Sequence, residues 1–303
     1  MPLAYMNLTL ACLLFSAQFA MSKLYERRSA GTLASSLWMS VFNGGWCLLL
    51  FGILNGFRLA ANATSLGYAF LFSLFNIGSG VCSVLAMKRG NLSTVTLYML
   101  VGGLLIPFFY GILALNEPLT ASKIAGVALM LLSFVPSVLR TRGEKSATKG
   151  GGLFFLLCAG CFLFNGLVSV VTSAHQKSGQ GVDENSFMML SAMFTFLLAG
   201  AGQGALHFKS HSRTFEGLGD GNRRDVLLCA LIVGGFTLFN GGGNRFSLMA
   251  ARSLEASIQF PIISASVIVL TALMGWACFK ERLRTGDFVS IILAGAGIAC
   301  FAL

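Results

Sequence analysis

The sequence predicts an all-α integral membrane protein with ten transmembrane helices, arranged as two five-helix repeats of opposite topology. Three observations predict this fold class: the composition, the spacing of the apolar segments, and a match between the two halves of the chain. Hydrophobic residues make up 55% of the 303 positions and charged residues only 11%. So few charged side chains cannot coat a soluble domain of this length.

Apolar stretches of about twenty residues, the length at which a helix crosses the hydrocarbon core of a bilayer, alternate with short polar loops. Backbone amides in lipid must be hydrogen-bonded within their own segment, and the alternating pattern of barrel strands is absent, so these stretches are expected to be helices. The expected spans are residues 3–22, 33–57, 66–87, 92–115, 120–139, 152–174, 186–206, 225–249, 256–279 and 286–303.

The first span is expected to be a retained helix and not a signal peptide, because cations follow it (Lys23, Arg27 and Arg28) and none precedes it. A polar linker at 141–150 divides the chain into a first repeat, residues 1–140, and a second repeat, residues 151–303.

The two repeats match without a gap over their C-terminal parts. Residues 72–80 (FSLFNIGSG) match 236–244 (FTLFNGGGN), and the same offset runs to the C-terminus, pairing Gly111 with Gly275 and Glu117 with Glu281. The third, fourth and fifth spans therefore correspond to the eighth, ninth and tenth. Because the repeat unit holds an odd number of helices, the second copy is inverted, an arrangement typical of secondary transporters.

Two segments, LNEPLTASKIAGVALMLLSFV at 115–135 and FKERLRTGDFVSIILAGAGIA at 279–299, each place a Glu before a span rich in small residues. In these segments the chain resembles the EamA-type drug/metabolite transporter superfamily. The resemblance covers essentially the whole chain. It implies two halves of five helices and the export or exchange of metabolites.

Glu117 and Glu281 lie between one helix and the next, where a carboxylate can accept hydrogen bonds from the free amides of a helix N-terminus. We expect them to be structural helix caps; a role in ion coupling is the alternative.

The odd-numbered loops hold 16 of the 21 Lys and Arg residues and the even-numbered loops hold five. Cations favour the cytoplasmic side, so the odd loops are expected to be cytoplasmic and both termini outside. The resemblance implies the opposite, since relatives in that family commonly have both termini inside.

Asn76 and Asn240 occupy equivalent positions near the middle of two spans, and they are the first candidates for substrate binding. The alternative is that both amides hold helices together. Three consecutive glycines separate Asn240 from Asn244, which is followed by Arg245. Because glycine weakens a helix, this segment predicts either a broken helix beside a cavity or close packing. Arg245 is a candidate to bind a carboxylate or phosphate; alternatively it snorkels or pairs with Glu255. Secondary candidates are Ser16, Gln18, Asn165, Tyr98 and Gln259.

Other classes of protein are disfavoured. An enzyme would need a catalytic constellation, and His175, His207 and His211 are all expected in loops. The eight cysteines lie in or beside apolar runs and indicate no disulfide framework or metal site. A channel would need a selectivity filter, and no motif for nucleic acid or for any cofactor occurs.

The sequence therefore predicts a multi-pass cytoplasmic-membrane transporter, monomeric or homodimeric in the lipid bilayer. It would move a small metabolite by alternating access. No Asp or Glu lies well inside a span, which favours exchange or facilitated transport over proton antiport. A multidrug or organic-cation exporter and a non-transporting membrane scaffold are the alternatives.

Overall fold

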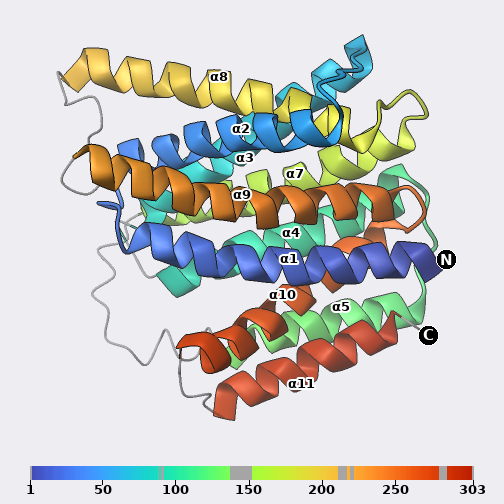
Figure 1. Ribbon diagram of the computed structural model, residues 1–303. Helices are drawn as coiled ribbons and strands as arrows, with labels where there is room; N and C mark the ends of the chain where they lie inside the picture. The colour runs from blue at the N-terminus through green and yellow to red at the C-terminus, as the bar shows by residue number, and fades with distance from the viewer. Residues whose placement is uncertain are drawn as a thin grey trace.

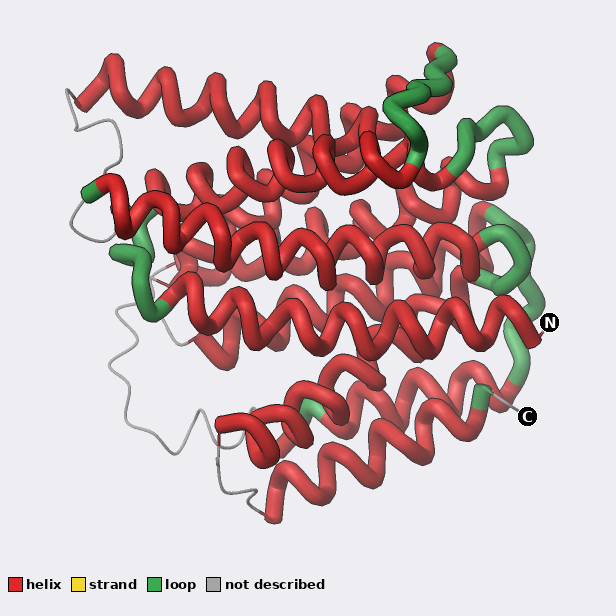
Figure 2. The backbone as a smooth tube through the Cα atoms, in the orientation of Figure 1, coloured by secondary structure: helices red, strands yellow, loops and turns green. Residues whose placement is uncertain are grey.

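The computed structural model describes residues 2–87, 89, 92–136, 152–210, 217–218, 222–279 and 285–301. Within these residues the secondary structure is helical, apart from one isolated bridge between Ser29 and Leu218, as Figure 2 shows. The helices are α1 (Pro2–Glu26), α2 (Leu33–Leu54), α3 (Ala63–Met87), α4 (Leu92–Ala114), α5 (Ala121–Ser133), α7 (Gly152–Lys177), α8 (Glu184–Ser210), α9 (Arg223–Ala251), α10 (Ala256–Phe279) and α11 (Thr285–Cys300).

Each of the ten expected spans coincides with one of these helices. Seven helices, α1 to α4 and α7 to α9, are long and apolar enough to cross a membrane, whereas α5, α10 and α11 contribute shorter apolar segments. By length and composition the chain is thus the helical bundle of a multi-pass membrane protein.

Helices of the first half pack mainly against helices of the second half. α1 lies along α9 and α10, while α7 lies along α3 and α4 (Figure 1). In addition, α2 packs against α8, α4 against α10, and α5 against α11. The two halves therefore share one interface that runs through the whole bundle.

The pairs α2/α8, α4/α10 and α5/α11 are antiparallel. Gly44 of α2 faces Phe196, whereas Asn55 beyond its C-terminal end bonds to Ser186 at the start of α8. Positions along α4 and α10 run in opposite directions in the same way, since Gly103 lies near Ser264 and Gly111 near Ser257. The pair α5 and α11 is antiparallel for the same reason. Gly126 in α5 lies near Phe301 just after α11, whereas Pro136, just beyond α5, lies near Gly286 at the start of α11.

Small residues allow the closest of these contacts. A Cβ added to Gly102 in α4 would lie 2.0 Å from the carbonyl oxygen of Phe162, and one added to Gly166 in α7 would lie 2.6 Å from that of Gly102. The two backbones touch at this crossing. Helices in lipid associate largely by such van der Waals contact, because the lipid tails are as apolar as the side chains.

The expectation of a broken helix at the three glycines was wrong, because α9 continues through them without interruption to Ala251. The alternative, close packing, is what the structure has. Phe51 lies against Gly241, Leu14 against Gly242 and Phe15 against Gly243. These side chains of α1 and α2 fill the space of the missing Cβ atoms, and their packing offsets the low helix propensity of glycine.

Candidate functional site

Asn76 is exposed although it lies on the face of α3 that carries most of the buried residues of this helix. Residues three, four and seven positions away on a helix share its face, and on α3 four of these neighbours, Ala69, Phe72, Ser73 and Ser79, are at most 5% exposed. The apolar side chains that α3 exposes to the surroundings, such as Leu74 at 43%, lie on the opposite face. Asn76 is nevertheless exposed, unlike these four neighbours on the same face of α3.

Asn240, the counterpart of Asn76, belongs to a chain of three amides. Its Nδ2 donates to Oε1 of Gln18 in α1 at 2.5 Å. Its Oδ1 accepts from Nδ2 of Asn244 at 3.2 Å, and the same Nδ2 donates to the backbone oxygen of Asn240 at 2.9 Å. All three side chains are only partly buried, although Val233 and Thr237 on the same face of α9 are buried. The predicted residues Gln18, Asn240 and Asn244 thus form one polar group between α1 and α9.

Asn165 joins α7 to α4. Its Nδ2 donates to the backbone oxygen of Met99 at 2.7 Å, and it lies beside Gly103, where an added Cβ would be 2.7 Å from that Nδ2 and 3.7 Å from Oγ of Ser264. Tyr98, one position before Met99, is partly buried and packs against the apolar cluster that contains Val95. The structure therefore brings Asn165 together with α4 and α10, while Tyr98 packs among apolar side chains.

Ser16 and Gln259 are buried. The hydroxyl of Ser16 donates to the backbone oxygen of Cys12 at 2.7 Å. Nε2 of Gln259 donates to the backbone oxygen of Ser247 at 2.8 Å and to its Oγ at 3.0 Å. Oε1 of Gln259 has no hydrogen-bond partner, although the residue is fully buried. An unpaired buried amide oxygen is costly unless a water or ligand group donates to it.

Arg245 does not join the amide group. Five residues separate it from Asn240, and at about 100° per residue its side chain projects some 140° around the helix. Its Nε donates to Oδ1 of Asn185 in the first turn of α8 at 2.7 Å. Glu255, the alternative partner, pairs with Lys123 instead. Arg245 thus lies on the side of α9 that carries exposed Leu238.

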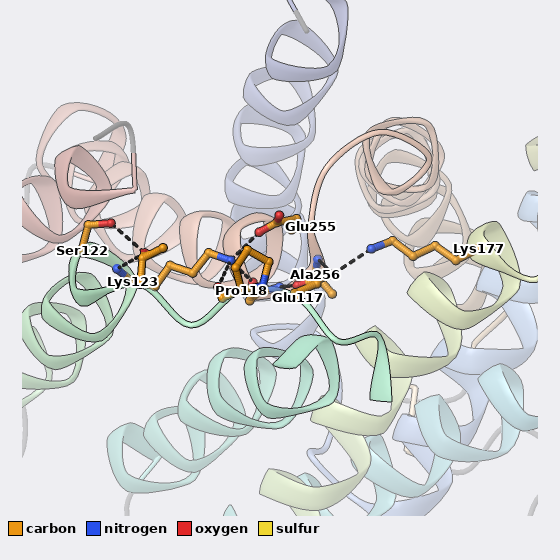
Figure 3. Close-up of polar contacts among 9 residues, drawn as sticks. Glu117, Pro118, Ser122, Lys123, Lys177, Glu255 and Ala256 are labelled. Atoms are coloured by element: carbon orange, nitrogen blue, oxygen red, sulfur yellow. Dashed lines mark hydrogen bonds and ion pairs between the residues drawn. The ribbon is translucent and has the colours of Figure 1, made fainter. Parts of the chain in front are cut away.

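Glu117 binds an N-terminus, but that of α10 and not that of the helix that follows it in sequence (Figure 3). Its Oε1 accepts from the backbone nitrogen of Ala256 and its Oε2 from that of Ser257, each at 2.8 Å. Nζ of Lys177 lies 2.8 Å from Oε1. Burial alone raises the pKa of Glu117, but hydrogen bonds from Lys177, Ser257 and Ala256 outweigh it and hold the pKa below its ordinary value. Glu281 lies outside the described residues.

Lys123 extends this network to α5, as Figure 3 shows. Its side chain is 5% exposed and donates to the carboxylate of Glu255, to Oγ of Ser257 at 3.0 Å and to the backbone oxygen of Pro118 at 2.7 Å. We call Glu117, Lys123, Lys177 and Glu255 the even-end network, because all four lie at the end of the bundle that holds the even-numbered loops.

Sequence reasoning missed Lys123 and Lys177 because their partners come from loops of the other half. The one available signal was the near balance of charge in the even loops, where carboxylates accompany most of the cations.

Two histidine placements were wrong. His175 lies in the last turn of α7, fully buried, with Nε2 3.1 Å from Oγ of Ser65 and its ring stacked on Phe187. His207 lies in α8, and His211 is outside the described residues. No group of three or more His, Cys, Asp or Glu side chains among the described residues is placed to hold a metal ion.

No family model matches the sequence, and no curated protein matches it. The fold, in contrast, occurs in solved structures, of which 29 chains match. One, described only as "Crystal structure of protein", has a TM-score of 0.72 and 15% sequence identity, over 98% of this chain and 95% of its own. At that identity the likeness shows a shared fold and nothing about substrate.

Proposed function

We propose that this protein is a carrier of the drug/metabolite transporter type. It moves a small polar metabolite across the cytoplasmic membrane by alternating access, as an exporter or exchanger. Its ten helices form two inverted repeats, and its substrate binds between them at Asn76, Gln18, Asn240, Asn244 and Asn165.

The helix packing supports the inverted repeat. The sequence match pairs α3 with α9, α4 with α10 and α5 with α11, and the two of these pairs that are in contact run antiparallel. The packing partners are also exchanged between the halves, since α1 packs on α9 and α10 as α7 packs on α3 and α4. Inverted repeats place their substrate site near the bilayer midplane, at the seam between the copies.

The observation that carries the proposal is the exposure of Asn76 on the otherwise buried face of α3. An amide in a dry helix interface would be buried and paired, because an unpaired amide in hydrocarbon costs several kcal/mol. Within the described chain Asn76 has no hydrogen-bond partner, and its counterpart Asn240 lies in a partly exposed amide group. Amides that stay exposed or partly exposed at equivalent positions of both halves favour a substrate path over a structural bond.

The even-end network supports alternating access. Glu117 precedes α5 and belongs to the first half, while Lys177, Ala256 and Ser257 belong to the second. These bonds hold the two halves together at one end of the bundle. A carrier must form and break such contacts as its two ends close in turn.

Efflux from liposomes tests the proposal. Purified protein is reconstituted in liposomes loaded with a defined mixture of amino acids, nucleosides, sugars and organic cations, and their release is followed by mass spectrometry. At least one class is expected to leave faster than from protein-free liposomes. The variant Asn76→Leu/Asn240→Leu should slow that release about tenfold or more, since each lost hydrogen bond is worth about 1 kcal/mol.

The variant must show the same size-exclusion profile and melting behaviour as the parent protein. Release that is no faster than from protein-free liposomes for every class, with the parent protein well folded, would contradict the carrier and favour the scaffold.

A further inference from the structure

Formally charged side chains in the described helices lie almost entirely at the helix ends. In the described helices each Asp, Glu, Lys and Arg lies within the first or last four residues of its helix, with the exception of Arg245. The guanidinium of Arg245 is bonded to Asn185 on another side of α9. The polar groups at Gln18, Asn240 and Asn244 are therefore carboxamides without a formal charge beside them.

The orientation of these amides follows from a backbone contact. A backbone carbonyl only accepts hydrogen bonds, so the atom of Asn244 that meets the carbonyl of Asn240 must be its Nδ2. Asn244 therefore donates to Oδ1 of Asn240, and Asn240 donates to Oε1 of Gln18. Among the described residues, Oδ1 of Asn244 then remains as an acceptor at one end of this amide chain and Nε2 of Gln18 as a donor at the other.

Two further amides are fixed in the same way. Asn165 donates to the carbonyl of Met99 and Gln259 donates to the carbonyl of Ser247, so in each amide the oxygen is the atom without a partner among the described residues. The oxygen of Gln259 is fully buried without a partner. The group as a whole thus offers several acceptors and at least one donor, all of them neutral.

We propose that the central site binds a solute without net charge that carries hydrogen-bond donors beside an acceptor, such as the hydroxyls of a sugar or the amide edge of a nucleobase, and that it rejects charged analogues. This inference rests on the proposed carrier function and names its substrate class. A charged solute would leave water for a site without a countercharge. A neutral one exchanges its hydrogen bonds to water for bonds to the amides.

The experiment compares solutes that differ only in charge: glucose with glucuronate and glucosamine, and uridine with uridine monophosphate. Two readouts are taken at neutral pH, stabilisation of the purified protein against thermal unfolding and release from proteoliposomes. At least one neutral member is expected to stabilise the protein and to leave at least tenfold faster than its charged partners, with no dependence on an imposed membrane potential.

A charge variant provides a second test. Asn240→Asp places a carboxylate in the amide group and is expected to shift the ratio of glucosamine to glucose binding at least tenfold toward glucosamine. Asn62→Asp is the matched control, because Asn62 lies in the loop before α3, where its Oδ1 accepts from the backbone nitrogen of Ser65. A purely structural Asn240 would leave the ratio the same in both variants.

The outcomes separate the two proposals. Release of charged members at the rate of their neutral partners or faster overturns the inference and leaves the carrier standing. Stabilisation by neutral members without any release supports the inference about the site and contradicts transport. If no solute of either kind stabilises the protein or leaves the liposomes, the assignment of this substrate class is overturned.

Discussion

Glu117 is the residue through which the two halves are joined most directly. Its carboxylate accepts from two backbone amides of α10 and pairs with Lys177. Both oxygens are used, so no isosteric neutral side chain reproduces its bonds. Gly111 is required beside it, since an added Cβ would lie 2.3 Å from Oε2 of Glu117.

Glu117→Gln is expected to lower the free energy of unfolding by about 2–3 kcal/mol, because the new amide N–H faces a buried N–H and Lys177 loses its partner. Lys177→Gln removes an ion pair whose side chains are 25% and 5% exposed, but it keeps both backbone bonds and leaves an amide that can donate to Glu117, so it should cost less than Glu117→Gln. Denaturant unfolding in detergent micelles measures both. An equal loss in the two variants would show that the bonds to α10 contribute little.

The same residue predicts the pH dependence of stability. The folded-state pKa of Glu117 lies below its ordinary value of 4.5, so the unfolded state binds the proton more tightly. The contribution to stability is therefore complete above the ordinary value and is lost as the pH falls through the folded-state pKa. Melting curves from pH 7 to pH 3 should fall less steeply at the acid end for Glu117→Gln than for the parent protein. Parallel curves would contradict this.

At this scale the sequence could indicate candidate positions but not the directions of their side chains. The repeat identified Asn76 and Asn240 because equal offsets survive in a linear alignment. It predicted a ligand role for Arg245 from depth alone, but depth does not say where around the helix a side chain points, and the guanidinium faces Asn185. The sequence could not predict the partner of Glu117, because Ala256 lies in the other half of the chain.

Among the helices, the crossing of α4 and α7 is the tightest. Gly102→Ala would place a Cβ 2.0 Å from the carbonyl oxygen of Phe162, so the helices must separate, at a cost of about 1–3 kcal/mol. Gly200→Ala in α8 meets nothing within 4 Å and should raise stability by about 0.5–1 kcal/mol, because alanine is the better helix former. Thermal unfolding of the two variants should shift in opposite directions, and a loss for both would contradict the packing argument.

Hydropathy predicted each of the ten described helices, since the length of an apolar run can be read directly from the sequence. It could not predict that α9 stays continuous across Gly241 and Gly243, because the helix is supported there by Phe51 and Phe15 from other helices. Local propensity gives way to packing at such positions.

For the molecule as a whole, the distribution of charge predicts the orientation. The even-numbered loops hold five of the 21 cations, and three of these pair with carboxylates: Lys123, Lys177 and Arg252. The N-terminal end of α1 and the C-terminal end of α11 lie at this same end of the bundle (Figure 1). Lys and Arg in short loops favour the cytoplasm, and this end holds the smaller share of them, so it should face outward.

A C-terminal fusion tests the orientation. Alkaline phosphatase, which is active only after export, is expected to be active there, while a green fluorescent protein at the same site should stay dark. Fusions in the loop between α9 and α10 should behave identically, because that loop lies at the same end. A fluorescent C-terminal fusion would reverse the assigned orientation.

The candidate site is not a perfect two-fold copy of itself. Asn240 is tied to Gln18, whereas Asn76 has no such tie within the described chain. In the proposed carrier, a solute that contacts both asparagines would meet a side chain fixed by a hydrogen bond in one half and an unfixed side chain in the other. Half-saturation concentrations of the proposed carrier measured from the two faces of the membrane should therefore differ, and the maximal rates should differ in the same ratio, because a carrier without an energy source drives no net flux between equal concentrations.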